Sequence, residues 1–281
     1  MTNTAQSTAR TSDGEYDLIL YDVADGVATI TLNNPERMNA FSNKMIEEWT
    51  DAIDRSRLDD AVRVVIVTGA GRGFCSGMDV AAEAGGRGVL RTETGPAAAR
   101  NSLRFSVHRV ARALQILDKP YIAAVNGPAA GAGMDMASMA DMRFCSETAR
   151  FTMAYVKMGI IPGDGGAYYL PRIVGLSTAL ELIWTGDLFG AEEALRIGYV
   201  TKVFPTETLM DETRAFARRL AEGPAVAIQL AKRLAYRSLD ATLEQALDLA
   251  QSAMVIAQST DDAKEGPRAF MEKRKPNFMG R

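Results

Sequence analysis

The chain has 281 residues, 47% hydrophobic and 24% charged, which is ordinary globular usage and excludes a disordered or fibrous protein. The formal net charge of -3 gives no overall attraction for nucleic acid or for an anionic membrane surface. The two cysteines, Cys75 and Cys145, are too few for a disulfide scaffold and lack a CxxC spacing. They indicate a reducing compartment, so we expect a cytoplasmic protein. No run of about 18 apolar residues occurs, so the sequence predicts no membrane-spanning helix.

The chain begins with a segment, residues 1–14, that has no apolar core typical of a signal peptide and that we expect to be a disordered tail. Two β-rich runs follow, Asp17–Tyr21 and Val27–Leu32. Asp25-Gly26 lies between them, and this dipeptide between strands predicts a hairpin.

Strands and helices then alternate. Ser42 stands at the N-cap position of an amphipathic helix that runs to about Leu58. Arg63–Thr68 is a β-branched run that predicts a buried strand. The sequence next predicts a helix over Ala97–Leu117 and a strand over Tyr121–Val125, with a proline between them.

A small-residue turn at Gly127–Gly133 leads into a helix that we expect to reach Ala140, and a strand follows over Met142–Cys145. This alternation favours an α/β fold with crossover connections. From about Thr206 the pattern is helical only. We therefore predict a core over 15–205 and a helical region over 206–281.

Three glycine-rich loops follow the predicted strands, at residues 68–79, 126–135 and 159–166. In open α/β sheets ligands gather at strand ends, and glycine lets the backbone itself approach a ligand. The first loop has no full GxGxxG at a strand-to-helix turn and no suitably placed acid for a ribose, so a dinucleotide cofactor is a poor interpretation.

Together these loops resemble the enoyl-CoA hydratase/isomerase (crotonase) superfamily. The resemblance covers nearly the whole chain and includes NNPERMNAFS, GRGFCSGMDV, AAVNGPAAGAGMDMA and, near the end, AFMEKRKPNF. It implies an α/β fold, a spiral core of repeated ββα units with a helical C-terminal region that trimerises. It also implies an acyl-CoA substrate, no separate cofactor, and a homo-oligomer that is a trimer or a dimer of trimers.

The resemblance implies an oxyanion hole made by the backbone N–H groups of Met78 and Ala132. Proton removal beside a thioester builds negative charge on the carbonyl oxygen, and preorganised N–H donors hold such charge well. Ala132 stands at the predicted start of a helix, where free N–H groups and the dipole favour an anion. The alternative is that both loops are only tight turns.

The acid–base residues depart from the best-known hydratases, in which two glutamates grip one water. The corresponding positions are Asp135 and Tyr155. Tyrosine is a poor base near neutral pH, since its unperturbed pKa is about 10. Asp135 matches an aspartate of some dienoyl-CoA isomerases and is the first candidate for a catalytic carboxylate. As a structural alternative, it is a first-turn acid that stabilises its helix.

Asp164 is the third acid–base candidate. Its position resembles an aspartate of the β-diketone hydrolases, which cleave a carbon–carbon bond with help from histidine. The single histidine, His108, lies outside every motif and is interpreted as a helix-face residue. The structural alternative for Asp164 is an N-cap for the following helix.

Several residues are candidates for holding the CoA group. By resemblance Met38 and Ala40 contact adenine and pantetheine, Arg37 lies near the phosphates, and Phe270 and Lys273 close over the nucleotide from the same or a neighbouring subunit. The loops that would hold the thioester add further candidates: Ser76, Gly77, Asp79 and Gly131. Residues 80–112 and the helix after Thr206 are expected to shape the acyl pocket.

The leading hypothesis is an enzyme that hydrates an enoyl-CoA, or isomerises its double bond, through an enolate. The alternatives are a β-diketone hydrolase that depends on Asp164 and a catalytically silent acyl-CoA-binding protein. Cys75 has no base beside it and is a poor nucleophile candidate. One histidine and two distant cysteines predict no metal site.

Overall fold

The computed structural model describes residues 10–11, 16–79 and 96–280. Its ten strands in this part of the chain are β1 (Arg10–Thr11), β2 (Ile19–Ala24), β3 (Val27–Leu32), β4 (Val64–Gly69), β5 (Tyr121–Val125), β6 (Ala129–Ala130), β7 (Met142–Ser146), β8 (Arg150–Thr152), β9 (Phe189–Gly190) and β10 (Lys202–Phe204). The main helices of the core are α1 (Asn43–Leu58), α3 (Pro96–Phe105), α4 (His108–Gln115), α5 (Ala132–Ser138), α6 (Gly166–Val174), α7 (Leu176–Thr185) and α8 (Ala191–Arg196). The C-terminal helices are α9 (Leu209–Ala221), α10 (Ala225–Ser238), α11 (Leu243–Gln258) and α12 (Asp262–Met271), and short 3-10 turns lie at Pro35–Arg37 and Ala154–Met158.

Seven strands form the main sheet in the order β1-β2-β3-β4-β5-β7-β10. β1, β2 and β3 pair antiparallel, and β3, β4, β5, β7 and β10 pair parallel. Every residue of β4 and β5 is buried, as expected of central parallel strands covered on both faces. The carboxyl ends of β4, β5 and β7 therefore lie along one edge of the sheet.

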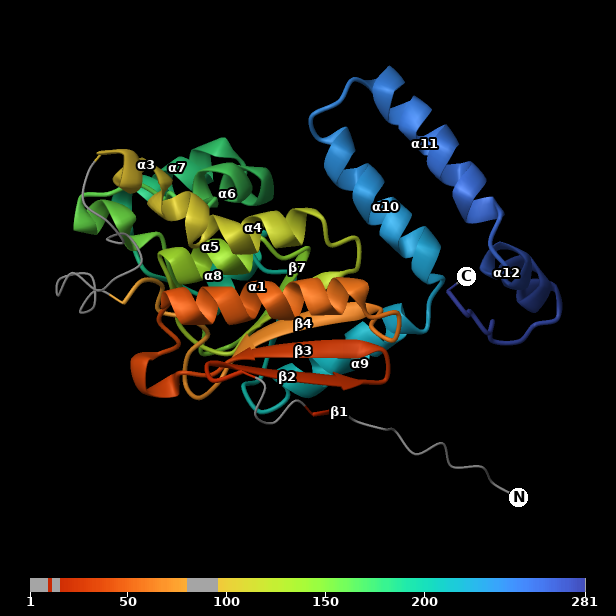
Figure 1. Ribbon diagram of the computed structural model, residues 1–281, viewed down its shortest axis with the longest axis horizontal. Helices are drawn as coiled ribbons and strands as arrows, with labels where there is room; N and C mark the ends of the chain where they lie inside the picture. The colour runs from red at the N-terminus through yellow and green to blue at the C-terminus, as the bar shows by residue number, and fades with distance from the viewer. Residues whose placement is uncertain (1–9, 12–15, 80–95, 281) are drawn as a thin grey trace.

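Helices cover both faces of this sheet (Figure 1). α1 packs on β2 and β3 with a buried stripe that includes Met45, Trp49 and Ile53, and α9 packs on the opposite face with Leu209 and Ala217. A second, three-stranded sheet has the order β6-β8-β9. This small sheet links the region before α5 to the region before α8.

The C-terminal helices α10, α11 and α12 extend away from the core (Figure 1). α10 is attached by polar contacts: Lys232 forms an ion pair with Asp141 at 2.8 Å, and the Tyr236 hydroxyl donates to the same aspartate over 2.8 Å. Neither α10 nor α11 has a buried residue. Within the described residues, no helix is both long and apolar enough to cross a membrane.

Most predicted elements are present. Ser42 accepts from the amide of Met45 and caps α1 as predicted, and the hairpin turns at Asp25-Gly26. The single helix predicted over 97–117 is wrong, because α3 and α4 are separated by a turn at Ser106 and Val107. The Ser106 hydroxyl donates to the Ser102 carbonyl over 2.6 Å, a local bond that competes with helix continuation. Of the tail predicted over 1–14, only residues 10–11 are described, and they pair with β2.

Candidate active site

Two backbone loops meet at the carboxyl edge of the parallel strands. β4 leads into the loop that carries Met78, and β5 leads through β6 into the start of α5. Cys75 forms an isolated parallel bridge with Ala129, and the amide of Ala130 donates to the Cys75 carbonyl over 3.0 Å. Ligands of open α/β folds gather at this kind of edge.

Glycine permits the close approach of the two loops. A Cβ on Gly77 would lie 2.6 Å from the carbonyl oxygen of Ala130 and 3.1 Å from the amide nitrogen of Ala132. Gly77 has φ +84°, and Gly131 combines φ +50° with ψ -120°, both favoured by glycine. Within the described residues the N–H groups of Met78 and Ala132 donate to no acceptor. Two free donors on adjacent loops have the form that an oxyanion hole requires.

A buried arginine holds the far end of α5. All seven residues of α5 are buried. Arg143 donates to the carbonyls of Ala140 at 2.5 Å and Tyr199 at 2.7 Å, and more weakly to that of Ser138 at 3.5 Å. A cation is favoured at the C-terminal end of a helix, where carbonyls lack partners. Arg143 thereby joins the C-terminal end of α5 to the backbone at Tyr199.

The three predicted acid–base side chains converge beside the start of α5. The Tyr155 hydroxyl lies 2.7 Å from Oδ2 of Asp135 and 3.0 Å from Oδ2 of Asp164. Asp135 has no exposed surface, whereas Tyr155 is 8% and Asp164 is 7% exposed. The Cζ atom of Tyr155 lies 4.0 Å from the position of a Cβ on Gly131, the residue before Ala132. The acid–base trio, Asp135, Tyr155 and Asp164, therefore adjoins the two free N–H groups.

The two short contacts of Tyr155 bear on the protonation of the two carboxyls. A tyrosine hydroxyl has a single proton and donates to only one carboxylate, so its second contact is a hydrogen bond only if that carboxyl is protonated. Burial raises the pKa of Asp135 to about 8, although the hydrogen bond from Tyr155 opposes the shift, and burial also raises the pKa of Asp164. Burial and the two acids raise the pKa of Tyr155, so the phenol stays protonated.

Asp135 is the member least able to carry charge. Its Oδ1 has no hydrogen-bond partner among the described residues, and its Oδ2 has only Tyr155. The nearby backbone N–H groups of Asp164 and Gly166 lower the pKa of Asp135 by less than burial raises it. The first-turn position in α5 favours an anion by about 0.3–1 kcal/mol, whereas burying a carboxylate with so few partners costs several kcal/mol. The cost of burial exceeds the gain from the helix, so the surroundings of Asp135 oppose its ionisation.

His108, interpreted from the sequence as a helix-face residue, lies beside the loop that carries Asp164. Its Nε2 is 2.8 Å from the Gly163 carbonyl, which only accepts, so Nε2 carries a hydrogen. The nearby His108 also lowers the pKa of Asp164, against the effect of burial. No sequence signal could reveal this contact, because it joins a side chain to a backbone carbonyl 55 residues later.

Most of the residues expected to bind CoA cluster around the first glycine loop. The amide of Ser76 donates to the Met38 carbonyl over 2.9 Å, and its hydroxyl lies 3.3 Å from the Arg37 carbonyl. Arg37 pairs with Asp79 at 2.6 Å while its side chain remains 60% exposed. The other expected members in these loops are Ala40, Gly77 and Gly131.

Phe270 and Lys273 are not brought to this site within one chain. α12 lies at the other end of the molecule from α6 and α7 (Figure 1), and Phe270 is 83% exposed. Of the segment 80–112, expected to shape the acyl pocket, residues 80–95 lie outside the described residues.

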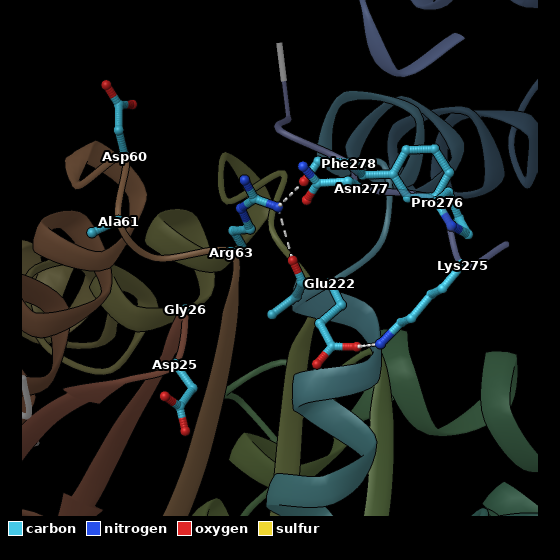
Figure 2. Close-up of a pocket in the computed structure, with 11 residues that line it drawn as sticks. Asp25, Gly26, Asp60, Ala61, Arg63, Glu222, Lys275, Pro276, Asn277 and Phe278 are labelled. Atoms are coloured by element: carbon cyan, nitrogen blue, oxygen red, sulfur yellow. Dashed lines mark hydrogen bonds and ion pairs between the residues drawn. The ribbon is translucent and has the colours of Figure 1, made fainter. Parts of the chain in front are cut away.

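A separate pocket of about 550 Å³ lies between the β2–β3 turn and the C-terminal segment (Figure 2). Arg63 donates to the carbonyls of Phe278 and Met279, and Lys275 pairs with Glu222 at 2.6 Å. Its lining includes no residue of the glycine loops or of the acid–base trio. These contacts attach the C-terminal segment to the core beside the pocket.

Cys75 belongs to the first glycine-rich loop. Cys75 is buried, its thiol donates to the Asn39 carbonyl, and burial raises its pKa to about 12, so it is not a thiolate. In the described ranges, no group of three or more His, Cys, Asp or Glu side chains is placed to hold a metal ion.

The α/β fold thus brings two loops with free backbone N–H groups together with two buried carboxyls and a tyrosine. The family model for enoyl-CoA hydratase/isomerase matches residues 22–281, and the chain belongs to this family.

Among relatives, the chain is 39% identical over 269 residues to 1,2-epoxyphenylacetyl-CoA isomerase of Escherichia coli (strain K12), covering 94% of this chain and 99% of that protein. It is 34% identical over 267 residues to crotonyl-CoA hydratase of Syntrophomonas wolfei, covering 95% and 99%. The crystal structure of enoyl-CoA hydratase from Bacillus anthracis is similar with a TM-score of 0.87 and 31% identity, covering 94% of this chain and 100% of that one.

Proposed function

We propose that the protein shifts the double bond of an enoyl-CoA by moving one proton between two carbons of the acyl chain. The observation that carries this proposal is the Tyr155 hydroxyl between Oδ2 of Asp135 and Oδ2 of Asp164. In the two-glutamate hydratases that the sequence resembles, water lies between the carboxylates. A phenol in that place favours proton transfer without the addition of water.

The roles follow from the geometry of the loops. The N–H groups of Met78 and Ala132 would hold the thioester oxygen as the enolate forms, and loss of one such donor typically costs about 2.7–4 kcal/mol. The acid–base trio would take the proton from one carbon and return it to another. The CoA group would lie along the loop residues, with a neighbouring subunit supplying the last two: Arg37, Met38, Ala40, Ser76, Gly77, Asp79, Gly131, Phe270 and Lys273.

The test is an assay of purified protein with 3-enoyl-CoA and 2-enoyl-CoA thioesters of several chain lengths. Isomerisation would make the absorbance of the conjugated thioester rise from the 3-enoyl substrate, with no 3-hydroxyacyl product by mass spectrometry. Absence of turnover on every 3-enoyl-CoA, with acyl-CoA binding intact, would refute the proposal.

Hydration of a 2-enoyl-CoA is the second candidate, because one relative is named a crotonyl-CoA hydratase. The same assay separates the two reactions. A hydratase would consume the conjugated thioester and form the 3-hydroxyacyl product. Faster hydration of crotonyl-CoA than isomerisation of any 3-enoyl-CoA would favour this second function.

We also propose a trimer or a dimer of trimers in the cytoplasm, with a core over 15–205 and a helical assembly region over 206–281. The apolar side chains left exposed on α11 and α12 support the assembly, because such surface is normally covered by a partner. They are Leu243, Leu247, Met254, Val255, Ile256, Phe270 and Met271. The two unpaired cysteines, Cys75 and Cys145, support a reducing compartment.

A further inference from the structure

The members of the acid–base trio differ in how they can exchange protons. Asp135 is fully buried, and Tyr155 is the only side chain among the described residues that hydrogen-bonds to its carboxyl. Any proton that enters or leaves Asp135 therefore passes through the Tyr155 hydroxyl. Tyr155 is also the member that lies against Gly131, next to the N–H of Ala132.

Asp164 is better placed than Asp135 to be the ionised member. It is 7% exposed, it stands two residues before the start of the nine-residue helix α6, and the N-terminal end of a helix favours an anion. The ionisable groups that act on it are Asp135, Tyr155 and His108, and His108 lies next to it through the contact with the Gly163 carbonyl. A cationic His108 would stabilise its charge.

We propose that Asp135, Tyr155 and Asp164 act as one unit in which Asp164 holds the negative charge, Asp135 holds a proton, and the Tyr155 hydroxyl passes protons to and from the substrate. In the resting enzyme Asp135 donates to Oη of Tyr155, and Tyr155 donates to Oδ2 of Asp164. This order uses both short contacts and leaves one lone pair of Oη for the substrate.

Each step balances in protons and charge. On uptake, a substrate C–H bond breaks, its proton bonds to Oη of Tyr155, the tyrosine's own proton moves to Oδ2 of Asp164, and the electron pair enters the enolate. On delivery, the Tyr155 O–H bond breaks, its proton bonds to the second carbon with the electron pair of the enolate, and the proton on Asp164 returns to Oη. The charge moves from Asp164 to the enolate and back, while Asp135 stays neutral.

The first test needs no substrate and so does not depend on the proposed function. Infrared spectra of the free enzyme near pH 6 would be compared for wild type, Asp135→Asn and Asp164→Asn. We expect the C=O band of a protonated carboxyl in wild type, its loss in Asp135→Asn and its retention in Asp164→Asn. A band lost only in Asp164→Asn, or no band in wild type, would overturn the inference.

The second test rests on the proposed function and uses the same two isosteric variants. The side-chain amide introduced by Asp135→Asn can still donate to Oη, so this variant should lose only about tenfold in kcat, whereas Asp164→Asn should lose about 100-fold in kcat with KM changed less than about twofold. Tyr155→Phe should lose as much as Asp164→Asn. A larger loss in Asp135→Asn than in Asp164→Asn would contradict the assignment.

Asp164 acts through Tyr155, so its role needs a readout that packing alone would not change. In wild type, kcat should fall at acid pH as Asp164 gains a proton, which gives the pH profile of kcat an acid limb. This acid limb should persist in Asp135→Asn and disappear from the residual activity of Asp164→Asn. An unchanged acid limb in Asp164→Asn would refute the role. If wild type turns over no enoyl-CoA, the proposed function fails, and the infrared result alone decides the inference.

Discussion

Helices α5 and α11 contain similar proportions of apolar residues but differ in what surrounds them. All seven residues of α5 are buried within one chain, whereas none of the sixteen residues of α11 is buried. The sheet, the glycine loops and Arg143 fix α5. On α11, Leu243, Leu247 and Met254 follow at spacings of four and seven, which places them along one face that the described residues leave exposed.

This difference separates chemistry from assembly. The two free N–H groups and the acid–base trio are positioned by contacts inside one chain, so substitutions there should change turnover or folding without changing the oligomeric state. Substitutions on the exposed face of the C-terminal helices should change the oligomeric state without unfolding the core. Four predictions test this division.

The largest expected effect comes from removing one backbone donor beside α5. Ala132 is the first residue of the helix, where proline is tolerated because its N–H has no helical partner, and the preceding Gly131 has no Cβ to clash. Ala132→Pro should lower kcat about 100- to 1000-fold. Steady-state kinetics measure the loss, and light scattering should show an unchanged oligomer.

Ala132→Ser is the matched control, because it keeps the N–H and should retain most of the activity. Wild-type turnover in Ala132→Pro would remove this N–H from the mechanism.

The second prediction concerns the stability of the α5 region. Arg143→Met keeps an apolar stem but leaves the carbonyls of Ala140 and Tyr199 without their charged donor, so we expect a loss of about 3 kcal/mol in the free energy of unfolding. Urea unfolding measures it. Arg150→Met, at an exposed arginine of β8, should change stability by less than about 0.5 kcal/mol. Equal effects of the two substitutions would argue against the role of Arg143.

These features differ in how well the sequence predicts them. Local signals such as the Ser42 cap and the Asp25-Gly26 turn were sufficient, because each acts within a few residues. The residue types of the acid–base trio were also identifiable. Their hydrogen-bond order was not, since Tyr155 is 20 residues from Asp135 and nine from Asp164 in sequence and only tertiary packing brings their oxygens together.

The break between α3 and α4 was not predictable for a similar reason. No glycine or proline marks it, and the Ser106 side chain that bonds the Ser102 carbonyl could equally have faced solvent on a continuous helix. The contact of His108 with the Gly163 carbonyl likewise depends on the final packing of α4.

The third prediction tests the C-terminal helices. Leu247→Asp places a charge in the middle of the exposed apolar row of α11, and loss of one buried leucine from an interface costs about 1.5–3 kcal/mol. The oligomer should dissociate at roughly 10- to 100-fold higher protein concentration in sedimentation experiments. Ser252→Asp, on another side of the same helix, should leave association unchanged. If Leu247→Asp associates like wild type, this row is not an interface.

The fourth prediction concerns the pH dependence of stability. The pKa of Asp135 rises from 3.8 to about 8 on folding, so between these values the folded chain holds a proton that the unfolded chain has lost. Stability falls with rising pH wherever the folded state binds more protons, so Asp135 should destabilise the protein as pH rises toward 8. Asp135→Asn cannot titrate and should avoid this loss.

From about pH 5 to about pH 8 this shift corresponds to a growth of roughly 3–4 kcal/mol in the stability difference between the variant and wild type. Thermal unfolding at several pH values measures it as a Tm gap that widens in favour of Asp135→Asn. Asp164→Asn is the informative comparison. It removes the charge of Asp164, which makes Asp135 easier to ionise, so the loss of stability with rising pH should become smaller but should not disappear. Parallel curves for wild type and Asp135→Asn would mean that Asp135 is ionised throughout, and the proton of the trio would then have to reside on Asp164.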